Sequence, residues 1–232
     1  MINGSQRLSK KIIDYTCSDG QIYIRGVRDR ATGGNALRKK SHISLAQFIV
    51  KNSDISELHQ YKKAFYLGSI LPDCKPSFLT EKHQFQETFD KVQGYIRDLT
   101  ENCDTDERNQ RNYWRKIGEV IHYIADYFTF PHNKSFPGNL KDHCMYEKEL
   151  KLYLRKYLRT GEALNKVRTM RNFYSADSLI EFISRKHKEY LKICHSVVED
   201  CRYILQLCWN VVAGIVQLLG MRTQQELVAV AA

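Results

Sequence analysis

The chain has 232 residues, of which 43% are hydrophobic, so it can bury the core of one domain, or of one domain with an appendage. Its four prolines and many Leu, Lys, Glu and Arg residues argue against a β-rich fold and favour helices. The formal net charge of +10 suits an anionic partner such as phospholipid or nucleic acid, although basic residues on solvated helix faces explain it equally well.

Residues 1–38 differ in pattern from the rest and are predicted to be an N-terminal appendage. Segments 12–17 and 21–27 are rich in β-branched and aromatic residues, and the Ser-Asp-Gly between them is a turn signal. The appendage is therefore expected to be either a β-hairpin or a disordered arm, and a third alternative is that the natural start lies near Lys39. The main domain is predicted to span 39–232.

Hydrophobic periodicity and capping signals predict helices throughout this domain. The expected helices cover 42–51, 54–70, 84–102, 106–128, 140–158 and 176–219, the last with a kink as an option. Ser41, Asp54 with Glu57, and Ser178 with Glu181 are the candidate caps. The expected fold class is all-α, a single-domain bundle of seven or so helices with a small N-terminal appendage.

The seven cysteines include no Cys-x-x-Cys pair, and Cys194, Cys201 and Cys208 recur every seven residues, which is typical of core packing on a helix. An odd cysteine count and an N-terminus without a signal-peptide-like apolar stretch favour reduced thiols in the cytoplasm, with peripheral membrane contact as an option. The most apolar stretch, 204–220, is interpreted as a core helix, with an interfacial membrane helix as the alternative.

Five residues of metal-ligand type lie between Gly118 and Glu147, namely His122, Asp126, His132, His143 and Glu147. His122 and Asp126 are four residues apart in an apolar-periodic run, so on a helix their side chains point the same way. Pro131 ends that helix just before His132, and His143 and Glu147 repeat the spacing at the start of the next helix. One such pair is common without a metal, but two pairs joined by a Pro-His turn predict a metal site. Imidazole nitrogen and carboxylate oxygen suit zinc.

The run His122-x3-Asp126-x5-His132, followed by His143-x3-Glu147, resembles the zinc-dependent phospholipase C family of bacteria. It is also similar to the fungal single-strand nuclease family, which shares that all-helical trinuclear zinc scaffold. The closing Glu147 and the short gap before His143 resemble the phospholipase branch, because the nuclease branch closes with Asp after a longer gap.

Two upstream segments strengthen the resemblance, which covers roughly Lys39 to Leu158. They are KKSHISLAQFIV around His42 and YLGSILPDCKPSF…H, which contains Asp73 and His83. The resemblance implies a di- or trinuclear zinc centre. Asp73, His83, His122 and Asp126 match the first zinc site, and His132, His143 and Glu147 match the second. His42 and Asp126 match the third, with Asp126 bridging.

The family completes its third zinc site with an N-terminal tryptophan, whereas both tryptophans here, Trp114 and Trp209, are internal. In choline-preferring relatives an aromatic residue follows the loop aspartate, whereas Cys74 follows Asp73 here, so the resemblance does not indicate phosphatidylcholine as the substrate. His59, His187 and His195 lie outside the motif and are interpreted as surface or packing residues.

The activity implied by the resemblance is zinc-dependent phosphodiester hydrolysis of phospholipase C type, which cleaves a phospholipid to diacylglycerol and a phosphorylated headgroup. Asp73 is the candidate general base, and its alternative role is that of a ligand alone. One alternative function is a nuclease or nucleotide phosphodiesterase on the same scaffold, with nucleic acid as the partner. Another is a zinc-stabilised binding protein without catalysis, which the missing terminal tryptophan favours.

Overall fold

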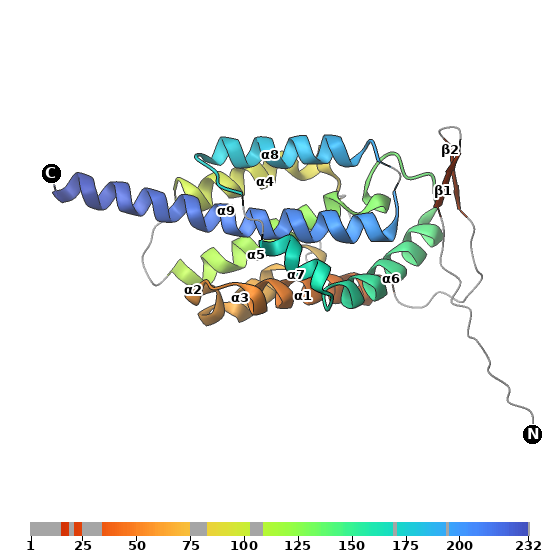
Figure 1. Ribbon diagram of the computed structural model, residues 1–232, viewed down its shortest axis with the longest axis horizontal. Coiled ribbons are helices and arrows are strands. Elements are labelled where there is room, and N and C mark those ends of the chain that lie inside the picture. The colour runs from red at the N-terminus through yellow and green to blue at the C-terminus, as the bar shows by residue number, and fades with distance from the viewer. Residues whose placement is uncertain are drawn as a thin grey trace, which may run out of the picture.

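The computed structural model describes residues 15–18, 21–24, 34–74, 83–102, 109–168, 171–193 and 195–231, with side chains described only between residues 40 and 225. Within these ranges the chain forms nine α-helices and one pair of short strands (Figure 1). The predicted all-α bundle with a small N-terminal appendage is therefore confirmed.

Strands β1 (Tyr15–Ser18) and β2 (Gln21–Ile24) pair antiparallel, with Ser18 opposite Gln21, as the hairpin alternative expected. Helix α1 spans Gly34–Asn52 and so begins well before the predicted start at residue 42. The residues before position 42 include Ala, Leu, Arg and Lys, which are strong helix formers. Ser41 therefore lies inside the helix, and the prediction that it caps the N-terminus is wrong.

Helix α5 (Gln110–Tyr127) occupies the middle of the bundle (Figure 1). It packs against α3 (Lys62–Gly68), α4 (Phe85–Thr100) and α9 (Val197–Ala231). Helix α6 (Leu140–Tyr157) packs against both α1 and α9. The bundle is completed by α2 (Ser56–Gln60), α7 (Gly161–Arg168) and α8 (Ala176–Tyr190). Helix α5 therefore has neighbours on several sides, which buries most of its length.

Two predicted helices are each divided in the structure. The segment 54–70 breaks at Tyr61 into α2 and α3, and Ile55 rather than Asp54 precedes α2. The segment 176–219 breaks into α8 and α9, because Ser196 accepts a hydrogen bond from the backbone N–H of Glu199 (3.2 Å) and starts a new helix. The N-cap of α8 is Ser175, whereas the sequence analysis expected Ser178. The sequence analysis also did not predict α7.

Helix α9 is long and apolar enough to cross a bilayer by length and composition, with a mean hydropathy of 1.7 over its most apolar window. However, 67% of that window is buried inside the bundle, where Cys201 and Cys208 lie in the core. This burial agrees with the interpretation of 204–220 as a core helix. Figure 1 shows that α9 extends beyond the other helices at its C-terminal end.

Helices α3 and α5 cross at two glycines. A Cβ atom at Gly118 would overlap the carbonyl oxygen of Phe65, and one at Gly68 would overlap that of Arg115. The two backbones are therefore in direct contact, which no larger residue permits. This contact places the end of α3 against the middle of α5. Asp73, on the 3₁₀ turn η1 (Pro72–Cys74) that follows, then lies 3.7 Å from His122 of α5.

We expect Gly118→Ala to destabilise the fold by about 1–3 kcal/mol, because the added methyl group must push α3 away from α5. The free energy of unfolding in urea measures this cost. Gly94→Ala in α4 is the matched control, since a Cβ there meets nothing within 4 Å and alanine is the better helix former by about 0.5–1 kcal/mol. Equal stability of the two variants would contradict the close crossing.

Candidate metal centre

The eight predicted ligand residues come from different elements and meet in the interior of the bundle. His42 lies on α1, Asp73 on η1, His83 just before α4, His122 and Asp126 on α5, His132 on the 3₁₀ turn η4 (Phe130–His132), and His143 and Glu147 on α6. They form three groups whose possible ligand atoms lie within 4.8 Å of one another. These groups are His42, His122 and Asp126; Asp73, His83 and His122; and His132, His143 and Glu147. The structure thus brings together the side chains that the sequence analysis selected, and their role as metal ligands stays a prediction.

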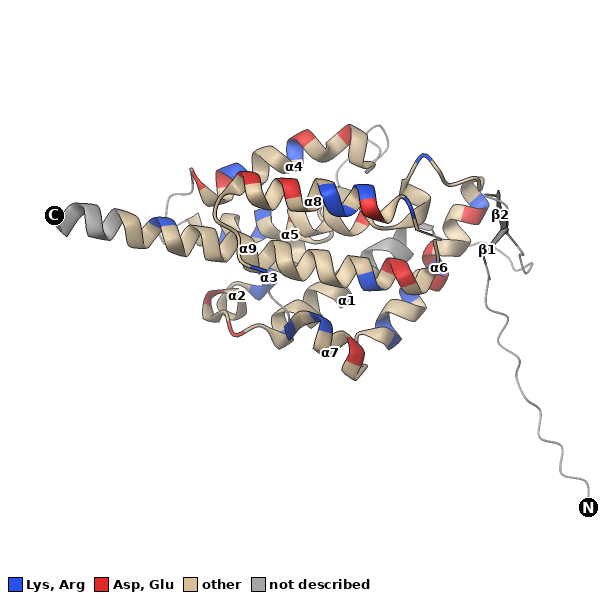
Figure 2. Cartoon of the chain, turned by 45° about the horizontal axis from the view of Figure 1, so that its top comes forward, with Lys and Arg blue, Asp and Glu red and all other residues tan. Residues whose placement is uncertain are grey.

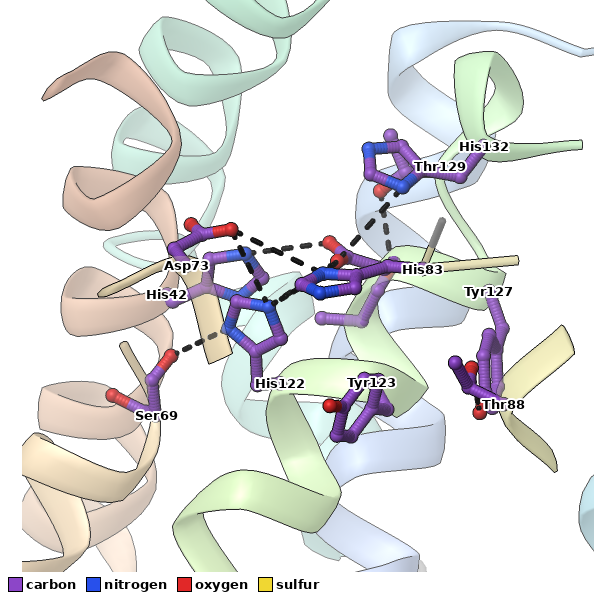
Figure 3. A network of polar contacts seen from close by, with 12 residues as sticks. His42, Ser69, Asp73, His83, Thr88, His122, Tyr123, Tyr127, Thr129 and His132 are labelled. Atoms are coloured by element: carbon purple, nitrogen blue, oxygen red, sulfur yellow. Dashed lines mark hydrogen bonds and ion pairs between the residues drawn. The ribbon is translucent and has the colours of Figure 1, made fainter. Parts of the chain in front are cut away.

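Helix α5 contributes the central pair of side chains. His122 is fully buried, and its Nδ1 lies 2.9 Å from the carbonyl oxygen of Ser69, to which it can donate a hydrogen bond (Figure 3). That bond leaves Nε2 directed at Asp126 Oδ2 (3.3 Å) and Asp73 Oδ1 (3.7 Å). Ser69 follows the glycine crossing, so the α3–α5 contact also orients the imidazole. Histidines that bind a metal through one ring nitrogen typically donate a hydrogen bond through the other, as His122 can to Ser69.

The carboxylate of Asp126 lies at the centre of four histidines. Its Oδ1 is 3.3 Å from His42 Nε2. Its Oδ2 is 3.0 Å from His83 Nδ1, 3.3 Å from His122 Nε2 and 3.8 Å from His132 Nδ1. Because the two oxygens face different rings, this side chain could serve two ions at once, as a bridging carboxylate does.

The group of His132, His143 and Glu147 is joined to the other two groups through His132. Its Nε2 is 3.1 Å from Glu147 Oε1, which also lies 2.8 Å from His143 Nε2. Because His132 Nδ1 faces Asp126, one ring lies between the two carboxylates. The side chain of His143 is 19% exposed, against 8% for Glu147, so this end of the centre is the more open to solvent.

Electrostatic coupling inside the centre is strong. Burial by itself would raise the pKa of Asp126, but the charges of His132 and His122 and hydrogen bonds from His122 and His42 hold it well below its ordinary value. Burial would lower the pKa of His122, yet Asp126 and Asp73 raise it overall. For His42 burial and the charge of His122 prevail and lower the pKa. The cluster therefore favours an ionised carboxylate at its core.

These residues fit divalent metal binding, and zinc in particular. The donors are five imidazoles and three carboxylates, the ligand types of hydrolytic zinc sites. Asp73 Oδ2 is buried and has no hydrogen-bond partner among the described residues, which is costly for a carboxylate oxygen in the absence of a cation. Cys208 is not one of the ligand candidates, since its Sγ faces the carbonyl oxygen of Ile121 on the core side of α5.

Asp200 on α9 supports the centre from outside, and the sequence analysis did not identify it. Its fully buried carboxylate accepts hydrogen bonds from the backbone N–H of Phe130 (2.8 Å) and the hydroxyls of Tyr146 (2.7 Å) and Tyr190 (2.8 Å). Burial raises the pKa of Asp200 to about 7, against the lowering effect of these three bonds. Phe130 begins the η4 turn, which carries His132, and Tyr146 precedes Glu147 on α6. Asp200 therefore connects both the η4 turn and α6 to α9.

A second support holds the residue after His132. Asn133 donates to the carbonyl oxygens of Thr129 (3.0 Å) and Tyr127 (3.3 Å), and its Oδ1 lies 3.0 Å from His187 Nε2. His187 stacks on Phe85 with ring centroids 4.0 Å apart. The η4 turn is therefore fixed on both sides of Pro131.

The three histidines outside the motif behave differently from one another. His187 and His195 are buried packing residues, and burial lowers the pKa of each to about 4. His195 stacks on Phe130 with centroids 4.2 Å apart. His59 is an exposed residue of α2 whose Nε2 lies 2.7 Å from the carbonyl oxygen of Ser53. The interpretation of these residues as surface or packing residues is confirmed.

We expect Asp200→Ala to weaken metal binding at His132, His143 and Glu147 by about 10- to 100-fold, because the η4 turn and α6 lose their common acceptor. The unpaired donors should also cost about 1–3 kcal/mol of stability. Competition with a chromophoric chelator measures the affinity. Gln217→Leu is the control, because it removes two hydrogen bonds between α9 and Phe173 away from the centre. If both variants bind zinc equally well, Asp200 has no positioning role.

Comparison with known families gives one match. The family model described as zinc dependent phospholipase C matches residues 41–197, which is more than half of the chain and contains all eight residues of the centre. No curated protein and no solved structure matches the chain.

Proposed function

The chain belongs to the zinc-dependent phospholipase C family, and we propose that it is a phosphodiester hydrolase that cleaves a phospholipid to diacylglycerol and a phosphorylated headgroup. The observation that carries this proposal is the position of Asp126 among four histidines, with His132 joining it to Glu147. A buried set of imidazoles and carboxylates with one unpartnered carboxylate oxygen supports a centre of two or three zinc ions.

The ligand sets follow the three groups. Asp73, His83, His122 and Asp126 would hold the first ion, and His132, His143 and Glu147 the second. The third would lie between His42 and Asp126, whose Nε2 and Oδ1 are 3.3 Å apart.

Bound zinc acts as a Lewis acid that activates water at neutral pH and neutralises charge on phosphoryl oxygens. The chain supplies the base for this reaction. Asp73 Oδ2 is buried and unpartnered in the described chain, so it is the atom that we propose takes the proton of the attacking water. The other oxygen, Asp73 Oδ1, lies 3.7 Å from His122 Nε2, on the side of the first ligand set.

The wall of the centre limits access by water. A cavity of about 30 Å³ adjoins His42, Asp126 and Glu147, and Leu45, Leu150, Leu154 and Ile204 also line it. That volume holds about one water molecule and no headgroup. The partly exposed His143 side is therefore the side from which we propose that the phosphodiester enters.

Two other functions remain to be separated by experiment. A nuclease or nucleotide phosphodiesterase agrees with the net charge of +10, but Glu147 occupies the closing position typical of phospholipases. A zinc-stabilised binding protein would keep the centre without turnover.

We expect purified protein to contain at least two zinc ions per chain and to release diacylglycerol from mixed phospholipid vesicles. Elemental analysis and parallel assays on vesicles, single-stranded DNA and a small soluble phosphodiester measure this. Chelation should abolish activity and lower the melting temperature, because the ligands join five elements. Cleavage of DNA alone would favour the nuclease, and zinc without turnover of any substrate would favour the binding protein. Protein without zinc would refute the whole proposal.

We expect Asp126→Asn to lose more zinc than Glu147→Gln, because Asp126 faces histidines of all three ligand sets whereas Glu147 faces those of one. Activity of Asp126→Asn should fall about 100-fold or more. Both changes replace a carboxylate by an amide of the same shape, so each controls for the other. The same zinc stoichiometry in the two variants would show that Asp126 does not bridge.

A further inference from the structure

One side of helix α6 is exposed and basic. Lys141, Lys148, Leu152 and Arg155 are exposed and lie at relative positions 0, 7, 11 and 14, which share one helix face. The three acidic residues of α6 lie elsewhere, since Asp142 caps the helix N-terminus, Glu147 is buried in the metal centre and Glu149 is half-buried. This face therefore presents positive charge without an exposed carboxylate beside it on the helix.

A ridge of residues connects this face to the metal centre. His143, Glu147, Lys151 and Arg155 follow one another at four-residue spacing, so each lies one turn beyond the last. Lys151, between the buried glutamate and the exposed arginine, is only 9% exposed. The centre and the basic face are thus neighbouring parts of one helix.

The cations along this ridge have no acidic partners among the residues that the structure describes. No ion pair joins Lys148, Lys151 or Arg155 of α6, or Lys40 of α1, to any carboxylate in the described ranges. Burial, followed by the charges of Lys40, Arg155 and Lys148, lowers the pKa of Lys151. Some basic residues elsewhere do have acidic partners, as Arg97 has Asp177 (2.6 Å) and Arg202 has Glu162 (2.9 Å). Figure 2 shows the basic and acidic residues along α6 and its neighbours.

Like charges held together in this way raise the free energy of the isolated protein, and an anionic partner would lower it. Two exposed leucines of α6 narrow the choice of partner. Leu140 is 75% exposed and Leu152 is 58% exposed. Cations mixed with exposed aliphatic residues on one helix suit a lipid surface, where the leucines reach the acyl boundary, better than a nucleic acid.

We propose that the exposed face of α6, together with Lys40, is the surface by which this protein docks on an anionic phospholipid bilayer. The inference rests on the proposed function, because docking there would bring the partly exposed His143 end of the centre near the lipid headgroups. It also indicates a preference for membranes that contain anionic lipid over purely zwitterionic ones.

The test compares two double charge reversals by sedimentation with vesicles of phosphatidylcholine, with and without phosphatidylglycerol. Lys148→Glu with Arg155→Glu changes the α6 face. Lys62→Glu with Lys63→Glu is the matched control, because these exposed lysines of α3 also lack ion pairs in the described chain and the charge change is the same. Circular dichroism and melting temperature verify that both variants fold.

We expect wild-type protein to bind only the vesicles that contain phosphatidylglycerol, and less tightly as salt is added. A cation near an anionic bilayer contributes about fivefold in affinity, so loss of two predicts roughly 25-fold weaker binding by the α6 variant, and more because the charges are reversed. The control should stay close to wild type. Equal binding by the α6 variant and wild type, or an equal loss in both variants, would overturn the docking surface.

Two further measurements separate this inference from the proposed function. Both variants should hydrolyse a soluble short-chain phosphodiester at the wild-type rate, because neither changes a residue of the centre. Vesicle binding through α6 without hydrolysis of any phosphodiester would refute the proposed function and leave the docking surface intact. Hydrolysis by a protein whose vesicle binding does not change with the α6 charges would refute the docking surface and leave the proposed function intact. A greater loss of single-stranded DNA binding than of vesicle binding in the α6 variant would assign the surface to nucleic acid and overturn the lipid proposal.

Discussion

The arrangement of this protein depends on the buried carboxylate of Asp126 and the four histidines around it. His42, His83 and His132 reach Asp126 from outside α5, and His122 reaches it from one turn away on the same helix. A buried carboxylate is tolerated only with such partners or with metal ions. Helix α1, the start of α4 and the η4 turn must therefore all meet α5 at this level of the bundle.

Two kinds of packing make that meeting possible. The direct backbone contact at Gly68 and Gly118 brings η1 and the carbonyl oxygen of Ser69 to α5, which places Asp73 and orients His122. On the opposite side Asp200 holds η4 and α6 to α9 through hydrogen bonds with Phe130 and Tyr146. The centre is thus set by rigid helices, and its ligands lie on α1, α5 and α6 as well as in the turns between helices.

Helix α6 links the chemistry of the centre to the outer surface. Its buried side supplies His143 and Glu147, and its exposed side carries cations that no carboxylate of the described chain neutralises. For a hydrolase whose substrate lies in a membrane, one rigid helix with both features would fix the orientation of the centre relative to the lipid. The length and apolar character of α9 serve the core instead, since most of its apolar window is buried.

Local pattern in the sequence was enough to predict the helical class and the metal centre, because four-residue spacing places His122 with Asp126, and His143 with Glu147, on one face of a helix wherever that helix packs. The family resemblance added His42, Asp73 and His83, which no local spacing connects to the rest. Only the tertiary structure identified Asp200, whose partners Phe130 and Tyr146 lie 70 and 54 residues away. It also decided that His187 is buried and that α8 ends before α9 begins. The reason is physical: helix periodicity is a local property of the chain, whereas a buried hydrogen bond between distant residues exists only once the helices have packed.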